Sequence, residues 1–347
     1  EKTIALGAEF WNDSCSPKEL AEAVALGATG ATSNPVIVGQ VVKADPGTWN
    51  PLIDSITREH RSATDEEIAW KLIDEIARHS AAILEPVYRS TSGDRGYLSV
   101  QVNPKYYRDA DRMFEHGRHL ASLAPNIAIK APTTPAGIEA MERLTAEGIS
   151  VNATVSFTLS QALAVATAIE RGLERAEEAG HKTVRPHVTL MVGRLDDHLQ
   201  RVMAKEQVVT DPADLNWAGI AVVRKAWSIF RQREFRSKLL VAAFRHHLHW
   251  SELVGQDVVF SMPYAYWKQF EASGMEPMAR IRETVPADRL ERLERFFPDF
   301  VKAYDENGLP PAAFAGFGPT VHTLNQFVGA TQDLYSLVRE RMLAAGA

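Results

Sequence analysis

The fold of this 347-residue sequence is restricted most by a regular alternation of short β-branched runs with longer amphipathic segments. Eight runs have the length and composition of buried strands. They span residues 3–10, 28–33, 97–102, 127–131, 150–155, 187–192, 239–244 and 258–261. Strands separated by helices pair in parallel, because a parallel pair needs a long crossover connection. The pattern therefore predicts an α/β protein with a (β/α)8 TIM barrel.

Amphipathic segments with apolar residues at helical spacing fill the intervals between these strands. The clearest span residues 17–26, 65–84, 108–121, 135–147, 159–179 and 218–231. A barrel of this kind usually needs about 250 residues, so this chain has residues to spare. We expect additional N-terminal-half structure at residues 40–67, where Pro46, Gly47 and Pro51 act as breakers. The rest forms a C-terminal helical extension of about 276–347, with helical patterns over 286–304 and 322–343.

No low-complexity linker or charge block divides the chain, so one elaborated domain over residues 1–347 is expected. Hydrophobic residues make up 45% of the sequence, which is enough for a large core. The formal net charge of -6 argues against nucleic acid as a partner, because a phosphate-backbone binder needs a broad basic surface.

Cys15 is the only cysteine, so neither an intrachain disulfide nor a cysteine zinc cluster can form. Residues 1–7 lack the long apolar stretch of a signal peptide, and no window reaches the length of a membrane span. We therefore expect a cytoplasmic protein in a reducing compartment, with no membrane partner.

Lys130 interrupts the otherwise uncharged, strand-like run of residues 126–134. A lysine that loses water on all sides has a lowered pKa, because burial disfavours the ammonium form. At neutral pH such an amine can attack a carbonyl and form a Schiff base. The alternative is a lysine at a strand end whose ammonium reaches solvent, which is the usual state of lysine side chains.

Polar residues stand near the carboxyl ends of the predicted strands, the end of a (β/α)8 barrel that carries the active site. The first strand leads into Asp13, and the second leads into Ser33 and Asn34. The later strands contribute Gln101, Lys130, Asn152, Thr154, Thr189, Arg194 and Arg245. We expect these side chains to converge on one site.

Ordered motifs occur along nearly the whole chain. Residues 30–35 read GATSNP, residues 127–138 read IAIKAPTTPAGI, and residues 147–154 read EGISVNAT. Further matches are VGR at 192–194, FG at 317–318 and TL at 323–324. Together these motifs resemble the transaldolase family, and several ordered matches are more specific than any lone short motif.

The resemblance implies a Schiff-base mechanism in which Lys130 attacks a substrate ketone. Asp13 would move the hydroxyl proton during carbon–carbon cleavage, and Thr154 would position a water. Asn34 and Asn152 would hold hydroxyls of the bound three-carbon unit. A carboxylate near a neutral amine can shuttle protons near neutral pH, so the chemistry of these residue types agrees.

The same resemblance assigns the distal anion of the substrate, phosphate in ordinary family members, to Arg194 and Arg245. Two guanidiniums can grip such an anion through forked hydrogen bonds. Ser33 and Thr189 complete the substrate-binding set. The resemblance implies no metal and no organic cofactor.

Simpler interpretations exist for several of these residues. Asp13 lies ahead of a predicted helix, so it could be a turn or capping residue. Asn34 precedes a proline and could shape a turn. Arg194 is close in sequence to Asp196 and Asp197, so a surface ion pair is its ordinary interpretation.

A group of histidines, His246, His247 and His249, follows the seventh predicted strand. With carboxylates nearby, a divalent-metal aldolase is the chemistry that such a group would suggest. Solvated histidines at the start of a loop are the more frequent case, and no companion ligand motif is present. The sequence therefore favours a site without a metal.

Three positions depart from the family patterns. Gln101 replaces the glutamate that transaldolases ordinarily have on the third strand, and glutamine cannot exchange a proton with water. Fructose-6-phosphate aldolases of the same superfamily also have glutamine there, but they have tyrosine where this chain has Met191. Ala243 replaces the serine that lies two residues before the second arginine, so one hydroxyl donor is lost.

The sequence therefore predicts a transaldolase-like transferase that passes a dihydroxyacetone unit from a ketose to an aldehyde acceptor. Two alternatives remain open: a class I aldolase that releases free dihydroxyacetone, and a non-catalytic relative that binds sugar phosphates. The expected partners are small sugar or sugar-phosphate molecules. The C-terminal helices could cover the barrel or pair with another subunit, which leaves a homo-oligomer open.

Overall fold

The protein is a (β/α)8 barrel in a computed structural model that describes residues 2–345. Eight strands close the barrel in chain order, and every neighbouring pair is parallel. The strands are β1 Glu9–Asn12, β2 Gly30–Thr32, β3 Tyr97–Gln101, β4 Ile127–Pro132, β5 Val151–Thr154, β6 His187–Met191, β7 Lys238–Ala242 and β8 Val258–Met262. The predicted fold class is confirmed.

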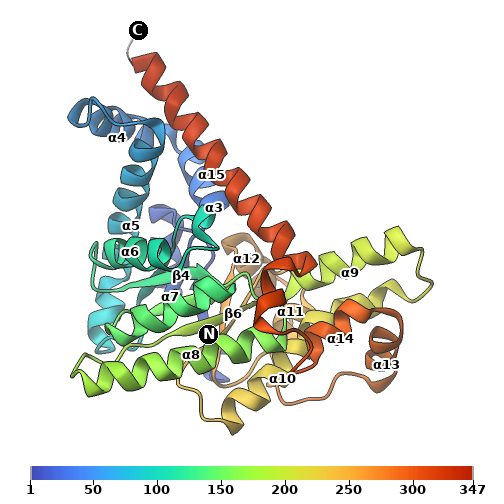
Figure 1. Cartoon of the computed structure of the whole chain (residues 1–347). Helices are drawn as coiled ribbons and strands as arrows, with labels where there is room; N and C mark the ends of the chain where they lie inside the picture. The colour runs from blue at the N-terminus through green and yellow to red at the C-terminus, as the bar shows by residue number, and fades with distance from the viewer. Residues whose placement is uncertain (1, 346–347) are drawn as a thin grey trace.

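Helices that connect successive strands, together with α12 after β8, cover the outside of the barrel (Figure 1). They are α2 Pro17–Ala25, α5 Asp65–Ser90, α6 Ala110–Ala121, α7 Pro135–Ala146, α8 Leu159–Glu178, α9 Val192–Glu206, α10 Ala218–Gln232, α11 Leu248–Ser251 and α12 Tyr264–Ala272. Local sequence fixes where several of them begin. Thr64 and Glu67 form a reciprocal capping box at α5, and the side chains of Thr134 and Thr158 cap α7 and α8.

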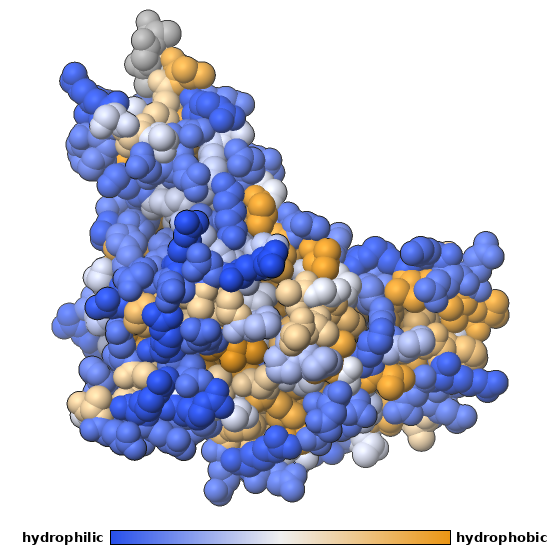
Figure 2. Space-filling view, viewed as in Figure 1, coloured by the Kyte–Doolittle hydropathy of each residue, from blue (hydrophilic) through white to orange (hydrophobic). Residues whose placement is uncertain are grey.

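The surplus residues form additional helices, as expected. They are α1 Lys2–Ala5, α3 Pro35–Ala44, α4 Pro46–Glu59, α13 Ala287–Phe296, α14 Pro298–Tyr304 and α15 Gly318–Ala345. Helix α15 runs from the barrel along α3, α4 and α5, and with them it forms an arm that projects from the body (Figure 1). The face of the arm seen in Figure 2 is largely hydrophilic over α4 and α5. Within the described residues, no helix combines the length and apolar character needed to cross a bilayer.

Two local predictions were wrong. Residues 3–10 were expected to form the first strand, but α1 occupies Lys2–Ala5 and the strand begins only at Glu9. Gly7 separates the two with a φ of +93°, a conformation that glycine adopts readily and that follows the end of α1. Pro51 was expected to break the chain, yet it lies inside α4, which begins with Pro46 at a first-turn position that accepts proline.

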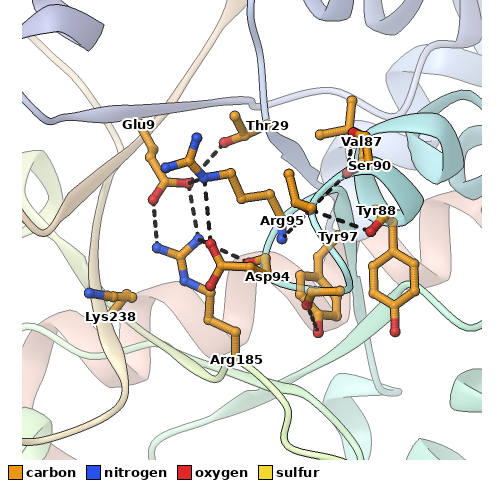
Figure 3. Close-up of polar contacts among 12 residues, drawn as sticks. Glu9, Thr29, Val87, Tyr88, Ser90, Asp94, Arg95, Tyr97, Arg185 and Lys238 are labelled. Carbon is orange, nitrogen blue, oxygen red and sulfur yellow. Dashed lines mark hydrogen bonds and ion pairs between the residues drawn. The ribbon is translucent and has the colours of Figure 1, made fainter.

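The amino end of the barrel is closed by charged side chains (Figure 3). Glu9 accepts hydrogen bonds from both terminal nitrogens of Arg185, at 2.5 and 3.1 Å, and lies 3.4 Å from Arg95 Nε. Thr29 Oγ1 donates to the same carboxylate. An apolar layer of Trp11, Tyr97, Ala128, Leu240 and Val259 lies among the buried residues of the barrel strands. Buried side chains therefore fill the barrel interior between its amino end and its carboxyl end.

Candidate active site

Lys130 lies on β4 between two polar neighbours, because β3 and β5 place Gln101 and Asn152 in register with it. Only 5% of the lysine is exposed, and its Nζ donates a hydrogen bond to the Ser33 carbonyl at 3.2 Å. Burial lowers the pKa of Lys130 to about 8, although the charge of Asp13 opposes this effect. A substantial fraction of this amine is therefore neutral near physiological pH.

Asp13 follows β1 and is held by a hydroxyl relay. Thr32 Oγ1 donates to Asp13 Oδ1 at 2.6 Å, and it lies 2.5 Å from Ser261 Oγ. Burial raises the pKa of Asp13, while Lys130 and the bond from Thr32 act in the opposite direction. Its carboxylate makes no hydrogen bond to the first turn of α2 within the described structure, so the capping interpretation does not describe it. Ser261 was not singled out from the sequence, because its role depends on the closure of β8 onto β1.

Asn34 caps α3, and it also faces the site. Its Oδ1 accepts a hydrogen bond from the Ile37 amide at 3.1 Å, as the turn interpretation requires. That bond fixes the amide group at the edge of a cavity, where its NH2 group points to no acceptor among residues 2–345. Ser33 has a different position: its hydroxyl donates to the Ser99 carbonyl at 3.1 Å, and its own carbonyl receives Lys130.

The polar groups below the lysine are tightly bonded, with one exception. Asn152 donates to Ser99 Oγ at 3.0 Å and accepts from Thr189 Oγ1 at 2.7 Å. Thr154 donates to the sulfur of Met191 at 3.8 Å. In contrast, both polar side-chain atoms of Gln101 are buried without a hydrogen-bond partner among the described residues. Buried polar atoms without a hydrogen-bond partner are rare in native proteins, and a bound water or ligand often supplies the partner.

A cavity of about 180 Å³ opens at the carboxyl end of the barrel. It is lined by seven of the predicted site residues, namely Asp13, Asn34, Lys130, Thr154, Thr189, Arg194 and Arg245. The other three, Ser33, Gln101 and Asn152, are buried around the lysine but do not line the cavity. The rest of the lining is largely apolar: Val36, Ile37, Met191, Ala242, Ala243, Phe244 and Pro263. The structure thus gathers the predicted residues at one end of the barrel.

Arg194, in the first turn of α9, is anchored by the C-terminal helix. Its Nη1 donates to Gln326 Oε1 at 2.6 Å and lies 3.5 Å from Thr323 Oγ1, and both partners belong to α15. The guanidinium also lies over the ring of Phe327, 5.6 Å from its centre. Burial, with the nearby charge of Arg245, lowers the pKa of Arg194 to about 10. The ion pair with Asp196 or Asp197, which was the simpler interpretation of Arg194, does not form.

Arg245, in the loop after β7, makes that ion pair instead. Its Nε and Nη2 donate to the carboxylate of Asp197 at distances from 2.8 to 3.1 Å. Its Nη1 donates to the carbonyls of Ala243 and Phe244. Nothing in the sequence distinguishes the two arginines as partners of Asp197, because the pairing depends on how α9 packs beside β7.

The histidine group is held by hydrogen bonds. His249 Nδ1 accepts the backbone N–H of Arg245 at 3.2 Å, so its proton is on Nε2, which donates to Asp196 at 2.7 Å. His246 Nε2 lies 3.3 Å from the same carboxylate oxygen, whereas His247 is exposed. Asp196, His246 and His249 are close enough to share a cation, but both ring nitrogens of His249 are already engaged. His249 thus holds the backbone of Arg245 in place. Because its Nε2 carries a proton, this nitrogen has no lone pair for a cation, and the three residues as arranged do not fit a metal.

The backbone is strained at two strand ends that border the site. Val155 follows β5 with a φ of +53°, and Ala243 follows β7 with a φ of +64°. A residue with a side chain pays about 1–2 kcal/mol in this left-handed region. Strain of this kind concentrates where function fixes the backbone.

Comparison with known proteins gives a match over most of the chain. Residues 10–307 match the family model described as transaldolase/fructose-6-phosphate aldolase. A protein named transaldolase 1 from Streptomyces avermitilis is 31% identical over 236 residues, which is 65% of this chain and 62% of that protein. A probable transaldolase from Thermus thermophilus is 30% identical over 264 residues, 75% of this chain and 89% of the relative. A transaldolase from Neisseria meningitidis serogroup C is 28% identical over 290 residues, 77% of this chain and 81% of the relative.

Proposed function

Because this chain belongs to the transaldolase/fructose-6-phosphate aldolase family, we propose that it transfers a dihydroxyacetone unit from a ketose to an aldehyde acceptor through a Schiff base on Lys130. The observation that carries the proposal is the buried Lys130 amine, with its pKa of about 8, beside a carboxylate in a cavity that holds two guanidiniums. It is an enzyme of transaldolase type, and its substrates are small anionic sugars. Buried Cys15, the only cysteine, fits a reducing compartment such as the cytoplasm.

In the first half-reaction, the neutral Lys130 amine attacks the ketone carbon of the donor. A carbinolamine forms, and loss of water leaves a protonated imine between Nζ and that carbon. Asp13 then takes the proton from the hydroxyl on the far carbon of the scissile bond, the carbon that becomes the aldehyde. The carbon–carbon bond breaks, its electron pair neutralises the iminium to give an enamine, and the remaining fragment leaves as an aldehyde.

In the second half-reaction, the enamine carbon attacks the carbonyl carbon of the acceptor aldehyde. Asp13 returns its proton to the new alkoxide, and the electron pair of the enamine forms the new carbon–carbon bond, which restores the iminium. Water then adds to the iminium, releasing the product ketose and the free Lys130 amine. Thr154 is the residue that orients this water, and Asn34 and Asn152 hold hydroxyls of the three-carbon unit.

The proposal is tested by trapping the imine. Incubation with a ketose phosphate and borohydride should add the mass of the reduced adduct at Lys130, located by peptide mass spectrometry. Lys130→Ala should lose both the adduct and turnover while its circular dichroism remains that of the unsubstituted protein. An adduct that persists on another lysine would refute the assignment, and a folded, unmodified protein would favour a sugar-binding relative without activity.

Gln101 bears on the balance between transfer and simple release. Its two unpartnered polar atoms lie on the strand next to Lys130, so it can hold a water near the imine but cannot exchange a proton with it. We expect Gln101→Glu to change the ratio of acceptor transfer to free dihydroxyacetone release in favour of transfer. The measurement compares the two products by mass in both proteins. An equal ratio in a variant that still traps at Lys130 would exclude Gln101 as the determinant.

A further inference from the structure

The two guanidiniums of the cavity differ in how many donors they leave for a ligand. Arg245 uses Nε and Nη2 on Asp197, and Nη1 on the carbonyls of Ala243 and Phe244. A guanidinium has five N–H donors, so these four engagements leave Arg245 about one N–H. Its positive charge is also balanced by the carboxylate of Asp197.

Arg194 has the opposite arrangement. Its protein partners, Gln326 and Thr323, both receive bonds from Nη1. Its Nε is buried without a partner, and Nη2 has no hydrogen bond to any residue between 2 and 345. Nε and Nη2 form one edge of the planar group, which is the edge that binds two oxygens side by side. Arg194, which lines the cavity, therefore keeps both donors of this edge free of protein partners, and no carboxylate of the described structure lies within ion-pair distance of it.

Apart from the two arginines, the polar lining of the cavity consists of groups proposed to act on the ketone and the three-carbon unit or to bind substrate elsewhere, namely Asp13, Asn34, Lys130, Thr154 and Thr189. Ala243, which lines the cavity, has no hydroxyl where transaldolases have serine. Its neighbours Phe244, Met191, Val36 and Pro263 are apolar. A phosphate monoester presents three oxygens and a charge near −2, whereas a carboxylate presents two coplanar oxygens and a single charge. One fork with one unbalanced positive charge matches the second group.

We propose that the distal anion recognised here is a carboxylate, so that the substrates are ketoses or aldehydes that end in a carboxylic acid rather than in a phosphate ester. This inference rests on the proposed transfer reaction, because it identifies the substrate class of the same site. Arg194 holds both carboxylate oxygens through Nε and Nη2, and Arg245 adds its remaining N–H from the other side of the cavity.

The experiment compares three six-carbon 2-ketoses that differ only at C6: a carboxylate, a phosphate ester and a neutral hydroxymethyl group. Each is offered with erythrose as acceptor, and kcat/KM is measured from the mass of the seven-carbon transfer product, which differs from all three donors. The carboxylate should exceed the phosphate by roughly tenfold or more, the value of one charge-assisted hydrogen bond. Equal or faster use of the phosphate overturns the carboxylate inference alone. Failure with all three, together with no borohydride adduct at Lys130, overturns the proposed function as well.

Two variants test the geometry. Ala243→Ser restores a hydroxyl donor, and Asp197→Asn releases the fork of Arg245, so each should move the phosphate-to-carboxylate ratio of kcat/KM towards phosphate. Ala179→Ser, on an exposed residue after α8, is the matched control and should leave the ratio unchanged. A ratio that stays constant in folded Ala243→Ser and Asp197→Asn proteins would show that these residues do not set the choice of anion.

Discussion

At Lys130, burial and the charge of Asp13 act in opposite directions on the same amine. Burial disfavours the ammonium form, whereas the carboxylate stabilises it, and the balance leaves the pKa of Lys130 at about 8. The carboxylate is itself affected, since burial raises the pKa of Asp13. Each group therefore titrates in the field of the other, so the pH dependence of imine formation reports on both.

Removal of the Asp13 charge should lower the pKa of Lys130 below 8, because the carboxylate is what raises it. The rate of imine formation increases with pH as the amine loses its proton, so in Asp13→Asn the midpoint of this increase should move to lower pH. Borohydride-trapped adduct, measured after short incubations across about pH 6 to 10, gives the midpoint. A midpoint that does not move, or that moves upward, would contradict the pairing.

Single residues were predicted well where one local signal was sufficient. The buried setting of Lys130 was predicted from its apolar run and is confirmed by its 5% exposure. The partner of Asp197 was not predictable, because Arg194 and Arg245 are equally plausible until the packing of α9 against β7 is known. The bond between Thr32 and Ser261 likewise exists only because the barrel closes. The catalytic and binding roles themselves stay predictions.

Among the elements, β1 links the two ends of the barrel. It begins with Glu9, which neutralises Arg185 and Arg95 at the amino end, and it leads into Asp13 at the carboxyl end. Glu9 is 9% exposed, and the Arg185 side chain is 11% exposed. Loss of this carboxylate would leave the buried Arg185 guanidinium with only the more exposed Asp94 as a counter-charge, which destabilises the folded state.

Glu9→Gln should therefore lower the free energy of unfolding by about 2 kcal/mol, because buried Arg185 loses charge-assisted hydrogen bonds, while Asp94, 3.5 Å from its Nη1, remains as a partial counter-charge. Urea denaturation followed by circular dichroism measures the change. The folded fraction should keep its Lys130 adduct, since Glu9 lies at the barrel end opposite the site. Glu291→Gln, at an exposed glutamate, is the control and should change stability by less than about 0.5 kcal/mol. A loss of similar size in both variants would refute a special role for Glu9.

The errors at element level have physical causes. The alternating pattern of residues 3–10 suits a strand, but the register of β1 with β2 and β8 starts only at Glu9. Propensity in such a short segment is weak compared with tertiary pairing. Pro51 was expected to break the chain, whereas packing of α4 against α5 and α15 keeps the helix continuous across it. The other strands were located closely, because each is a short run buried along nearly its whole length.

At the scale of the molecule, α15 joins parts that are distant in sequence. It packs against α3, α4 and α5 in the arm and also contacts α9 beside the cavity. Arg341 pairs with Asp54 of α4, and Tyr335 accepts a hydrogen bond from Trp70 of α5 at 2.8 Å. We propose that barrel and arm form a single domain, as the absence of a linker in the sequence predicted.

If that is correct, heat should unfold the whole chain in one transition. The far-ultraviolet circular dichroism signal, tryptophan fluorescence and loss of transfer activity should share one midpoint, because α15 cannot leave the arm without releasing Arg194. Differential scanning calorimetry should show one peak whose calorimetric and van't Hoff enthalpies agree. An earlier transition in which helicity falls while activity persists would mean that the arm unfolds separately.

The anchoring of Arg194 by α15 also sets an order of events during protein synthesis. All eight strands, Lys130 and Asp13 leave the ribosome before Gln326 and Thr323 are translated. The guanidinium of Arg194 then still lacks its anchors. In a nascent chain Arg194 therefore finds its protein partners only after every strand of the barrel has been translated, because those partners lie on α15.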